Sequence, residues 1–272
     1  MTHQVTDPNS HVFFVTSHGT AGDHWFEWLA KALNAHPEIM IFAGEAVRQK
    51  YFHERARNER PDTALFVRFL ADLGMPYTAV GDCYSYRAYQ LESLSEMFGD
   101  QVRFINVVRH PVAWLHFYVS WRCNNMRMPA TITTPLDHEW KVTCHDTFSA
   151  LNLKSYSRED VAIWSAYQGM DILNRMVSDK RVNVNYPLER IVESPDYFQK
   201  IISWLTHGRV QFDKERLKQT YARLDVPSRA NGVILTDLEK ERATWPQWKE
   251  EAWSRIVKPE TLAMFEEYGY TL

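Results

Sequence analysis

The stretch His11–Trp25, HVFFVTSHGTAGDHW, decides the fold that we expect for this chain. Its first seven residues, His11–Ser17, are mainly apolar and rich in Val and Phe, which predicts a short buried strand. A turn with Gly19 and Gly22 follows. Apolar residues then recur on one side of His24–Asn34, as they do in a helix that covers a core. A buried strand, a glycine turn and a helix in this order indicate the start of an α/β fold.

The same alternation of strand and helix patterns continues along the chain. Further strands are expected at Ile39–Ala43, Tyr77–Asp82, Val102–Arg109 and Val182–Tyr186. Further helices are expected at Pro61–Leu73, at Pro111–Trp121, after the capping pattern at Ser157, and at Pro195–Thr206, Lys214–Leu224 and Pro259–Tyr268. We therefore predict a three-layer α/β/α fold with a central parallel sheet of about five strands.

No repeat or linker divides the sequence, so the expected organisation is a polar tail at 1–10 and one domain over 11–272. Residues 122–156 have no clear periodicity and contain Pro129 and Pro135. A segment of this length is expected to be a functional loop or lid rather than a plain connection.

Composition limits the classes of protein. The 272 residues are 45% apolar, and 31 Lys and Arg stand against 34 Asp and Glu, for a net charge of −3. This excludes a disordered chain and argues against a dedicated nucleic-acid binder. Three cysteines favour a reducing compartment, and the N-terminal residues lack the pattern of a signal peptide. We expect a cytoplasmic protein with neither a nucleic-acid nor a membrane partner.

Two of the expected strand ends carry residues suited to anions. The first joins the opening strand to its helix through Ser17, His18, Gly19, Thr20, Ala21, Gly22, Asp23, His24 and Trp25. Backbone N–H groups in such a turn, at a helix N-terminus, can hold a phosphate or sulfate group. The alternative is a tight strand–helix turn with Asp23 as the cap.

The second strand end is Arg109-His110-Pro111. A charged Arg at the end of a buried strand needs a partner, because an isolated buried charge is costly. That partner is either a structural carboxylate or an anionic ligand bound by the fork of donors.

Together the two segments resemble the sulfotransferases that use 3′-phosphoadenosine 5′-phosphosulfate (PAPS), and this resemblance implies a fold like that of P-loop NTPases. In that family a loop like PKSGTTW binds the 5′-phosphosulfate, and GTAGDHW (Gly19–Trp25) is similar to it. A strand that ends in Arg-x-Pro, as at Arg109, binds the 3′-phosphate. The segments that resemble the family further are Asn34–Ile39, Gly44–Phe52, Ala79–Tyr86, Val182–Leu205 and the closing EEYGY.

The resemblance implies PAPS as donor, its bisphosphate (PAP) as product, and no metal. It assigns the nine residues from Ser17 to Trp25 to binding of the donor. Trp25 is expected either to pack against the adenine of the donor or to lie in the core. It assigns Arg109 to the 3′-phosphate, with Ser120 as the nearest hydroxyl, because Phe117 stands where the family has Ser. Arg229 and Gly232 resemble a late phosphate clamp. The resemblance has departures: Thr20 replaces the usual basic residue, and Asp23 and His24 replace two hydroxyl residues.

A base must accept the proton of the acceptor. Glu45 is the first candidate by resemblance, and an exposed capping residue is the alternative; His18, His116 and His53 are the other candidates. Loop donors together with His18, His24 or Arg48 are candidates to replace the missing basic residue at Thr20. Asp82 is expected either to orient the acceptor or to pair with Arg87.

We expect residues 122–156, the predicted loop or lid, to lie on the acceptor side of the site. The aromatic, non-basic composition of this segment, with Trp140 and the adjoining Trp121, favours a neutral or cationic small-molecule acceptor. A homodimer stays an open alternative for the assembly. Other functions are also open: a non-catalytic nucleotide or anion binder of the same fold, and, less favoured, a P-loop kinase, whose G-K-[ST] signature is absent. A zinc site from Cys123, His138, Cys144 and His145 is disfavoured by the spacing.

Overall fold

The structure is a computed structural model, and it describes residues 11–17, 23–43, 60–83, 96–125, 158–178, 185–224 and 238–272. The chain divides into two compact units. Unit 1 comprises Met1–Arg109 and Arg181–Ile234, and unit 2 comprises His110–Lys180 and Leu235–Leu272. We describe each unit by itself, and the single domain expected over 11–272 stays a prediction.

Unit 1 is an α/β unit built on a parallel sheet. Its strands are β1 (His11–Thr16), β2 (Ile39–Ala43), β3 (Ala79–Cys83), β4 (Val102–Val108) and β5 (Asn185–Pro187). Its helices are α1 (Asp23–Asn34), α3 (Arg60–Leu73), the short η2 (Gly99–Gln101), α10 (Leu188–Glu193), α11 (Pro195–Leu205) and α12 (Lys214–Arg223). All four strand pairs are parallel, in the order β2-β3-β1-β4-β5. The predicted fold class is confirmed, because five parallel strands form one central sheet.

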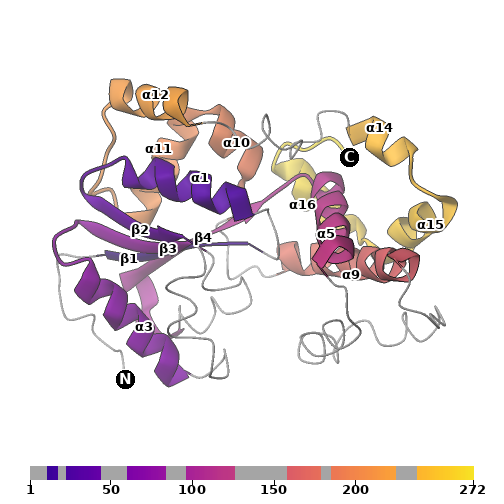
Figure 1. Ribbon diagram of the computed structural model, residues 1–272, viewed down its shortest axis with the longest axis horizontal. Coiled ribbons are helices and arrows are strands. Elements are labelled where there is room, and N and C mark those ends of the chain that lie inside the picture. Colours follow the sequence, from indigo (N-terminus) through magenta and orange to yellow (C-terminus); the bar gives the residue numbers. More distant parts are fainter. Residues whose placement is uncertain are drawn as a thin grey trace. The chain divides into compact units, whose positions relative to one another are not determined.

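Helices cover both faces of this sheet (Figure 1). On one face, α3 packs through Phe66, Val67 and Leu70 against Val12 and Phe14 of β1, and all five side chains are buried. On the other face lie α1, α11 and α12, whose aromatic rings meet where Trp28 of α1 contacts Phe198 and Tyr221. Successive residues of a strand point to opposite faces, so the apolar run of β1 contributes to both halves of the core.

A close approach between β1 and β3 depends on glycine. Gly81 of β3 is paired in register with Phe13 of β1. A Cβ atom on Gly81 would overlap the ring of Phe13, which is itself fully buried. The absence of a side chain at Gly81 therefore lets the Phe13 ring lie across the neighbouring strand.

Helix ends in unit 1 follow simple capping rules. Ser194 caps α11 by accepting a hydrogen bond from the Tyr197 backbone N–H at 3.2 Å, and Pro195 occupies the first helical position. Asp213 caps α12 in the same way. These residues satisfy N–H groups that have no partner inside the helix.

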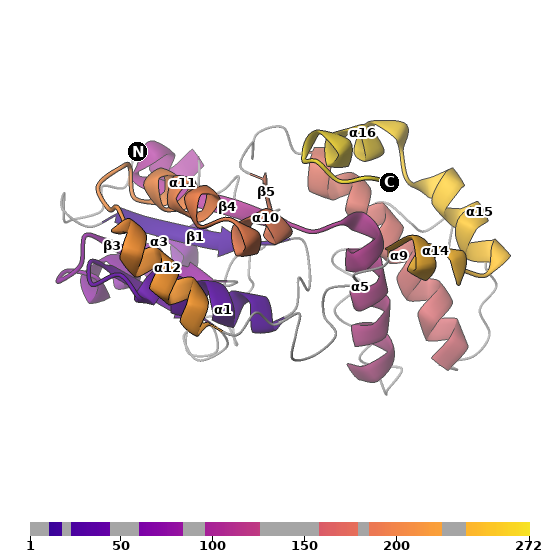
Figure 2. The ribbon, with the colours of Figure 1, turned by 90° about the horizontal axis from the view of Figure 1, so that it is seen from above.

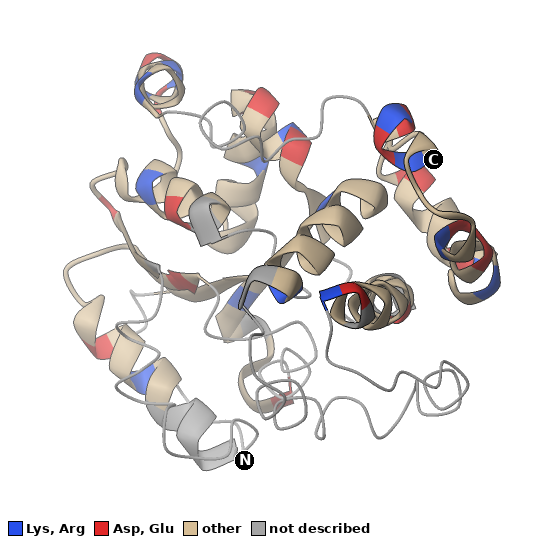
Figure 3. Cartoon of the chain, turned by 45° about the vertical axis from the view of Figure 1, so that its right-hand side comes forward, with Lys and Arg blue, Asp and Glu red and all other residues tan. Residues whose placement is uncertain are grey.

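Unit 2 is helical. Its elements are α5 (Pro111–Asn125), α9 (Arg158–Ser178), α14 (Leu238–Ala243), α15 (Gln247–Ile256) and α16 (Pro259–Glu267). Helices α5 and α9 lie side by side (Figure 2), and α15 and α16 also pack on α9. The close packing of α5 on α9 is explained in part by Gly169, where a Cβ atom would overlap Leu115. Both α14 and α15 carry acidic and basic residues (Figure 3), as expected of helices with one solvated face.

The C-terminal end of α16 is closed by a Schellman motif. The Tyr270 N–H bonds to the Phe265 carbonyl at 3.1 Å, and the Gly269 N–H bonds to the Glu266 carbonyl at 2.8 Å. Gly269 has φ 91°, a left-handed conformation that glycine adopts without strain. The motif directs the last residues back toward α5, where the Thr271 carbonyl lies 2.8 Å from Nε2 of His110.

The predicted elements agree closely with the observed ones, with three corrections. Residues 122–125 continue α5, so the predicted loop at 122–156 begins too early; its remainder lies outside the described residues. Strand β5 is described over Asn185–Pro187, so it ends one residue beyond the predicted Tyr186, while 182–184 of the predicted strand lie outside the described residues. Helices α10, α14 and α15 were not predicted, because they are short or mainly polar. Within the described ranges, no helix is long and apolar enough to cross a membrane.

Candidate functional site at the carboxyl edge of the sheet

Buried polar residues collect at the carboxyl ends of three neighbouring strands of unit 1. Each is at most 1% exposed: Thr16 and Ser17 at the end of β1, Asp82 in β3, and Asn106 and Arg109 at the end of β4. Polar side chains are rare in such positions unless they bind one another or a ligand. Ligands of open parallel sheets bind beyond the carboxyl ends of the strands, so this edge is the candidate site.

The register of the strands brings the two predicted anion segments together. Thr16 of β1 is paired with Asn106 of β4, and Phe14 is paired with Asp82 of β3. Ser17 therefore leaves the sheet between Asp82 and Arg109. From β1 the chain turns toward β2, while from β4 it turns toward β5 on the opposite side. This reversal is the switch point at which such folds bind ligands.

Arg109 is the only basic residue among the five buried polar residues of this edge. Its side chain is 1% exposed. A guanidinium at that depth requires acceptors around it, and its planar fork suits a carboxylate or phosphate group. The predicted position of Arg109 at a strand end is correct to within one residue, since β4 ends at Val108.

Asn106 was missed by sequence reasoning. Its Nδ2 donates to Oδ1 of Asn185 at 2.6 Å, which links the end of β4 to the start of β5. Its own Oδ1 is buried and accepts no hydrogen bond from any residue that the structure describes. A buried acceptor without a donor is costly, so a ligand or water at this edge would satisfy it. The sequence signal that identifies Asn106 as a candidate is a polar residue near the end of an apolar strand.

The N-terminus of α1 lies at the same edge, because α1 follows β1. Its free N–H groups and the helix dipole favour a negative charge there. The Trp25 indole on this helix is 1% exposed and packs edge-on against Trp28 at 6.3 Å between ring centroids. Its assignment to the donor stays a prediction.

Cys83 ends β3 beside Asp82 and is fully buried. Desolvation raises the pKa of its thiol well above the usual value, and the neighbouring Asp82 charge acts in the same direction. The thiol is therefore protonated at neutral pH, and Cys83 is a packing residue rather than a nucleophile.

Two predicted site residues lie on α5, in unit 2. Nδ1 of His116 is 2.8 Å from Oε1 of Glu241 on α14. A carboxylate in this position orients an imidazole through a hydrogen bond. Ser120 is partly buried one turn further along α5. The roles assigned to His116 and Ser120 stay predictions.

The remaining predicted residues lie outside the description that the structure allows. The backbone is undescribed at His18, Gly19, Thr20, Ala21, Gly22, Glu45, Arg48, His53, Arg87, His138, Cys144, His145, Arg229 and Gly232. Asp23 and His24 belong to α1, but their side chains are not described. Among the described residues, no three His, Cys, Asp or Glu side chains gather as metal ligands.

Comparisons with known proteins add two structural likenesses. Neither a protein-family model nor a curated protein matches the sequence. The sulfotransferase domain from the curacin biosynthetic pathway is similar at 16% identity, over 98% of this chain and 100% of that one, with a TM-score of 0.44. A sulfotransferase from Alicyclobacillus acidocaldarius is similar at 13% identity, over 86% and 99% of the two chains, with a TM-score of 0.34. The fold assignment rests on the strand order and registers given above.

Proposed function

We propose that this chain is a sulfotransferase that moves a sulfuryl group from PAPS to a hydroxyl or amine of a small-molecule acceptor. One observation carries the proposal: Ser17 and Arg109 leave adjacent parallel strands, β1 and β4, both at most 1% exposed. The resemblance of the sequence to PAPS-dependent sulfotransferases assigns these same two segments to the phosphosulfate and to the 3′-phosphate of one donor molecule. The proposal includes a location in the cytoplasm, with the acceptor as the main partner.

The residues at this edge suit an anionic donor. Arg109 supplies a fixed positive charge, Ser17 a hydroxyl, and the N-terminus of α1 its free N–H groups. The buried Oδ1 of Asn106 would accept a hydrogen bond from the donor or from a water bound with it. In this assignment Arg109 holds the 3′-phosphate, and the turn from Ser17 to Trp25 holds the phosphosulfate.

PAPS supplies the sulfuryl group, and the chain supplies position and charge. Backbone N–H groups near the start of α1 stabilise negative charge on the peripheral oxygens of the transferring group. Aligning the acceptor with the bond that breaks lowers the entropy lost on reaching the transition state. A base removes the proton of the acceptor, with Glu45 as first candidate and His18 and His116 after it.

One titration tests the donor. The full chain is titrated by calorimetry with PAP and, separately, with ATP and Mg²⁺. We expect PAP to bind in the micromolar range and ATP with Mg²⁺ to bind more weakly. If PAP does not bind at millimolar concentration, the sulfotransferase proposal is wrong. Tighter binding of ATP with Mg²⁺ would favour the kinase alternative.

Arg109→Ala tests the assignment of the 3′-phosphate. We expect it to weaken PAP at least tenfold, because about 1.5–3 kcal/mol is typical of a hydrogen bond to a charged group. Adenosine 5′-phosphosulfate, which lacks the 3′-phosphate, should lose much less affinity. An equal loss for both ligands would contradict the assigned role. Arg68→Ala, on an exposed position of α3, is the matched control and should bind as the unsubstituted chain does.

Turnover distinguishes the enzyme from the non-catalytic alternative. Thr20 stands where the family has a basic residue, and this replacement is the feature that favours a binder without activity. The measurement is transfer of labelled sulfuryl groups from PAPS to a panel of small alcohols, phenols and amines. Tight PAP binding without transfer to any of them would support the non-catalytic binder. With an accepted substrate, Glu45→Gln should lower kcat at least a hundredfold if Glu45 is the base.

A further inference from the structure

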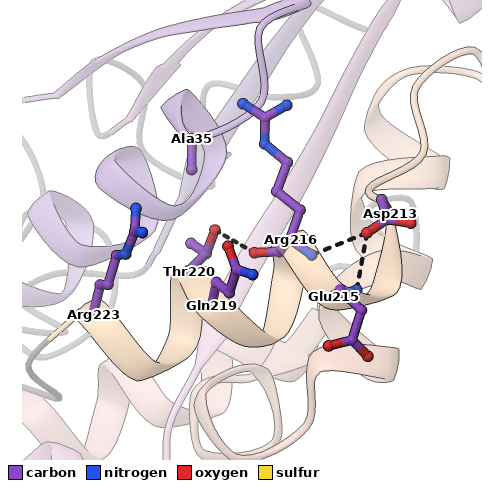
Figure 4. Close-up of a pocket in the computed structure, with 7 residues that line it drawn as sticks. All are labelled: Ala35, Asp213, Glu215, Arg216, Gln219, Thr220 and Arg223. Atoms are coloured by element: carbon purple, nitrogen blue, oxygen red, sulfur yellow. Dashed lines mark hydrogen bonds between the residues drawn. The ribbon is translucent and has the colours of Figure 1, made fainter.

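A groove in unit 1 lies beside α12, away from the strand ends that carry the proposed donor site. It has a volume of about 580 Å³ and is lined by Ala35, just after α1, and by six residues in and next to α12 (Figure 4). Those six are Asp213, Glu215, Arg216, Gln219, Thr220 and Arg223. Helix α1 starts at the carboxyl edge of the sheet, so Ala35 belongs to the opposite edge. The groove is therefore separate from the proposed donor site.

Two arginines give the groove its positive end. Arg216 and Arg223 are seven residues apart, so they lie on the same face of α12, separated by about 10 Å along the helix axis. Both side chains extend from the helix in the same direction (Figure 4). Within the described part of the chain, no hydrogen bond or ion pair engages either guanidinium. Two exposed guanidinium groups are thus available to a ligand.

The acidic residues of the groove lie at its other end. One oxygen of the Asp213 carboxylate accepts hydrogen bonds from the backbone N–H groups of Glu215 and Arg216, at 3.0 and 3.1 Å. Glu215 pairs with Lys218 at 3.0 Å, with both side chains exposed. Each carboxylate keeps a second oxygen for a cation. The lining is therefore negative near Asp213 and positive from Arg216 to Arg223.

The charge of Arg216 also acts on its surroundings. His36 is buried and accepts a hydrogen bond from the Glu38 N–H on Nδ1, so its Nε2 donates to the Gln211 carbonyl at 3.2 Å. Desolvation lowers the pKa of His36; the Gln211 carbonyl and the Glu38 charge oppose this, and the Arg216 charge lowers the pKa further. An anion bound to Arg216 would therefore weaken the lowering of the His36 pKa by the Arg216 charge.

From this pattern we propose that the groove binds a short extended peptide segment that carries one cationic and two acidic side chains. The cation faces Asp213, and the two carboxylates face Arg216 and Arg223, whereas Glu215 points to the other side of α12 (Figure 4). The eleven residues from Asp213 to Arg223 span about 15 Å, the reach of about five extended residues. A dense polyanion fits less well, because its charges would also meet Asp213. Guanidinium groups bind carboxylates with two parallel hydrogen bonds.

The test uses the full chain and the synthetic peptide Lys-Gly-Glu-Gly-Glu-Gly, whose three charged side chains share one face when it is extended. The peptide is labelled with a dye at its N-terminus and amidated at its C-terminus. Fluorescence anisotropy at low salt measures binding. We expect the double variant Arg216→Ala, Arg223→Ala to bind at least tenfold more weakly. Arg68→Ala removes the same charge from an exposed position on α3 and should bind like the unsubstituted chain.

Two further ligands complete the test. The peptide Glu-Gly-Lys-Gly-Glu-Gly has the same composition with the cation displaced, and it should bind at least fivefold more weakly. Tripolyphosphate should bind more weakly than the first peptide. Equal binding of the two peptides, unchanged binding by the double variant, or preference for tripolyphosphate would each overturn the proposal.

NMR gives a readout that does not depend on activity. Binding of the first peptide should raise the pKa of His36, because it neutralises Arg216. Arg216→Ala alone should raise that pKa too, and the peptide should then add little. No change in the His36 titration on peptide binding would contradict contact with Arg216. The double variant should bind PAP as the unsubstituted chain does. Failure of the peptide proposal is therefore distinguishable from failure of the proposed function.

Discussion

The side-chain amide of Asn34 pairs with both backbone hydrogen-bonding groups of Ile41. Nδ2 of Asn34 donates to the Ile41 carbonyl at 2.9 Å, and the Ile41 N–H donates to Oδ1 of Asn34 at 2.8 Å. Ile41 lies in β2, the edge strand of the sheet. Asn34, the last residue of α1, thus occupies hydrogen-bonding groups that an edge strand otherwise leaves open.

Asn34→Ala should therefore lower the free energy of unfolding by about 1–2 kcal/mol, through the loss of two hydrogen bonds in a partly buried position. Urea denaturation followed by circular dichroism measures the change. Glu27→Ala, on an exposed position of the same helix, is the control and should change stability by less than about 0.5 kcal/mol. Equal stability of Asn34→Ala and the unsubstituted chain would show that water replaces the amide fully.

Gly81→Ala should destabilise unit 1 by about 2–3 kcal/mol, because the added methyl group overlaps the buried ring of Phe13. The effect should shrink in a Phe13→Leu background, where the smaller side chain leaves room beside β3. A double-mutant cycle from denaturation curves measures this coupling. Additive effects of the two substitutions would mean that the Phe13 ring does not limit the space at Gly81.

Asn174→Ala should destabilise unit 2 by about 2–4 kcal/mol, because it leaves several buried groups without partners. Oδ1 of Asn174 accepts from the Lys258 N–H at 3.0 Å and from the Thr261 hydroxyl at 2.8 Å. Its Nδ2 donates to the Ile256 carbonyl at 2.8 Å. These bonds hold the turn between α15 and α16 against α9.

Hydrogen exchange locates the effect of Asn174→Ala. Faster exchange should concentrate in α15 and α16, while β1 and β3 keep their protection. Thr261→Ser retains the hydroxyl that donates to Asn174 and serves as the mild control. A uniform change in exchange over both units would contradict a local role for Asn174.

Lys249→Met should raise stability at pH 7. The Lys249 side chain is 9% exposed, and its Nζ lies 4.0 Å from the centre of the Trp245 ring. Desolvation lowers the pKa of Lys249 to about 8, although Glu241 and Glu250 oppose the shift. The folded state therefore holds this proton less tightly than the unfolded state does, and the charged form is destabilising at neutral pH.

The pH dependence gives the sign of this effect. Between pH 8 and about 10.5 the unfolded chain binds more protons at Lys249 than the folded chain, so stability from this group rises with pH. The gain is at most about 3 kcal/mol, since one pKa unit corresponds to 1.4 kcal/mol. Denaturation at pH 7, 8, 9 and 10 measures it. Lys249→Met should remove this contribution to the slope of unfolding free energy against pH. An unchanged slope would show that other groups cause the pH dependence.

Arg109→Lys should weaken PAP several-fold under the proposed function, because an ammonium keeps the charge but loses the planar fork. Calorimetry at two salt concentrations measures the affinity. Arg109→Ala should lose more than Arg109→Lys, and higher salt should narrow the difference between the unsubstituted chain and the alanine variant. Indistinguishable PAP affinities for all three proteins would remove Arg109 from the binding site.

Local patterns predicted the first half of the fold well. The apolar run at β1, the amphipathic pattern of α1 and the strand at Ile39–Ala43 all appear where the sequence indicates them. These elements depend on the period of neighbouring residues. Helices α10 and α14 escaped prediction because six residues are too few for a clear period, and their order depends on contacts with distant elements.

The sequence by itself determined the chemistry of the strand ends: the glycine turn after Ser17 and the charge of Arg109 are local and visible. Only the tertiary structure decided that β1 lies between β3 and β4, which places Ser17 between Asp82 and Arg109. It also joined Asn106 to Asn185, 79 residues away, buried Trp25, and aligned Arg216 and Arg223 beside Ala35. The pairing of strands depends on how much apolar surface the whole sheet buries, and a pattern of neighbouring residues cannot predict that total.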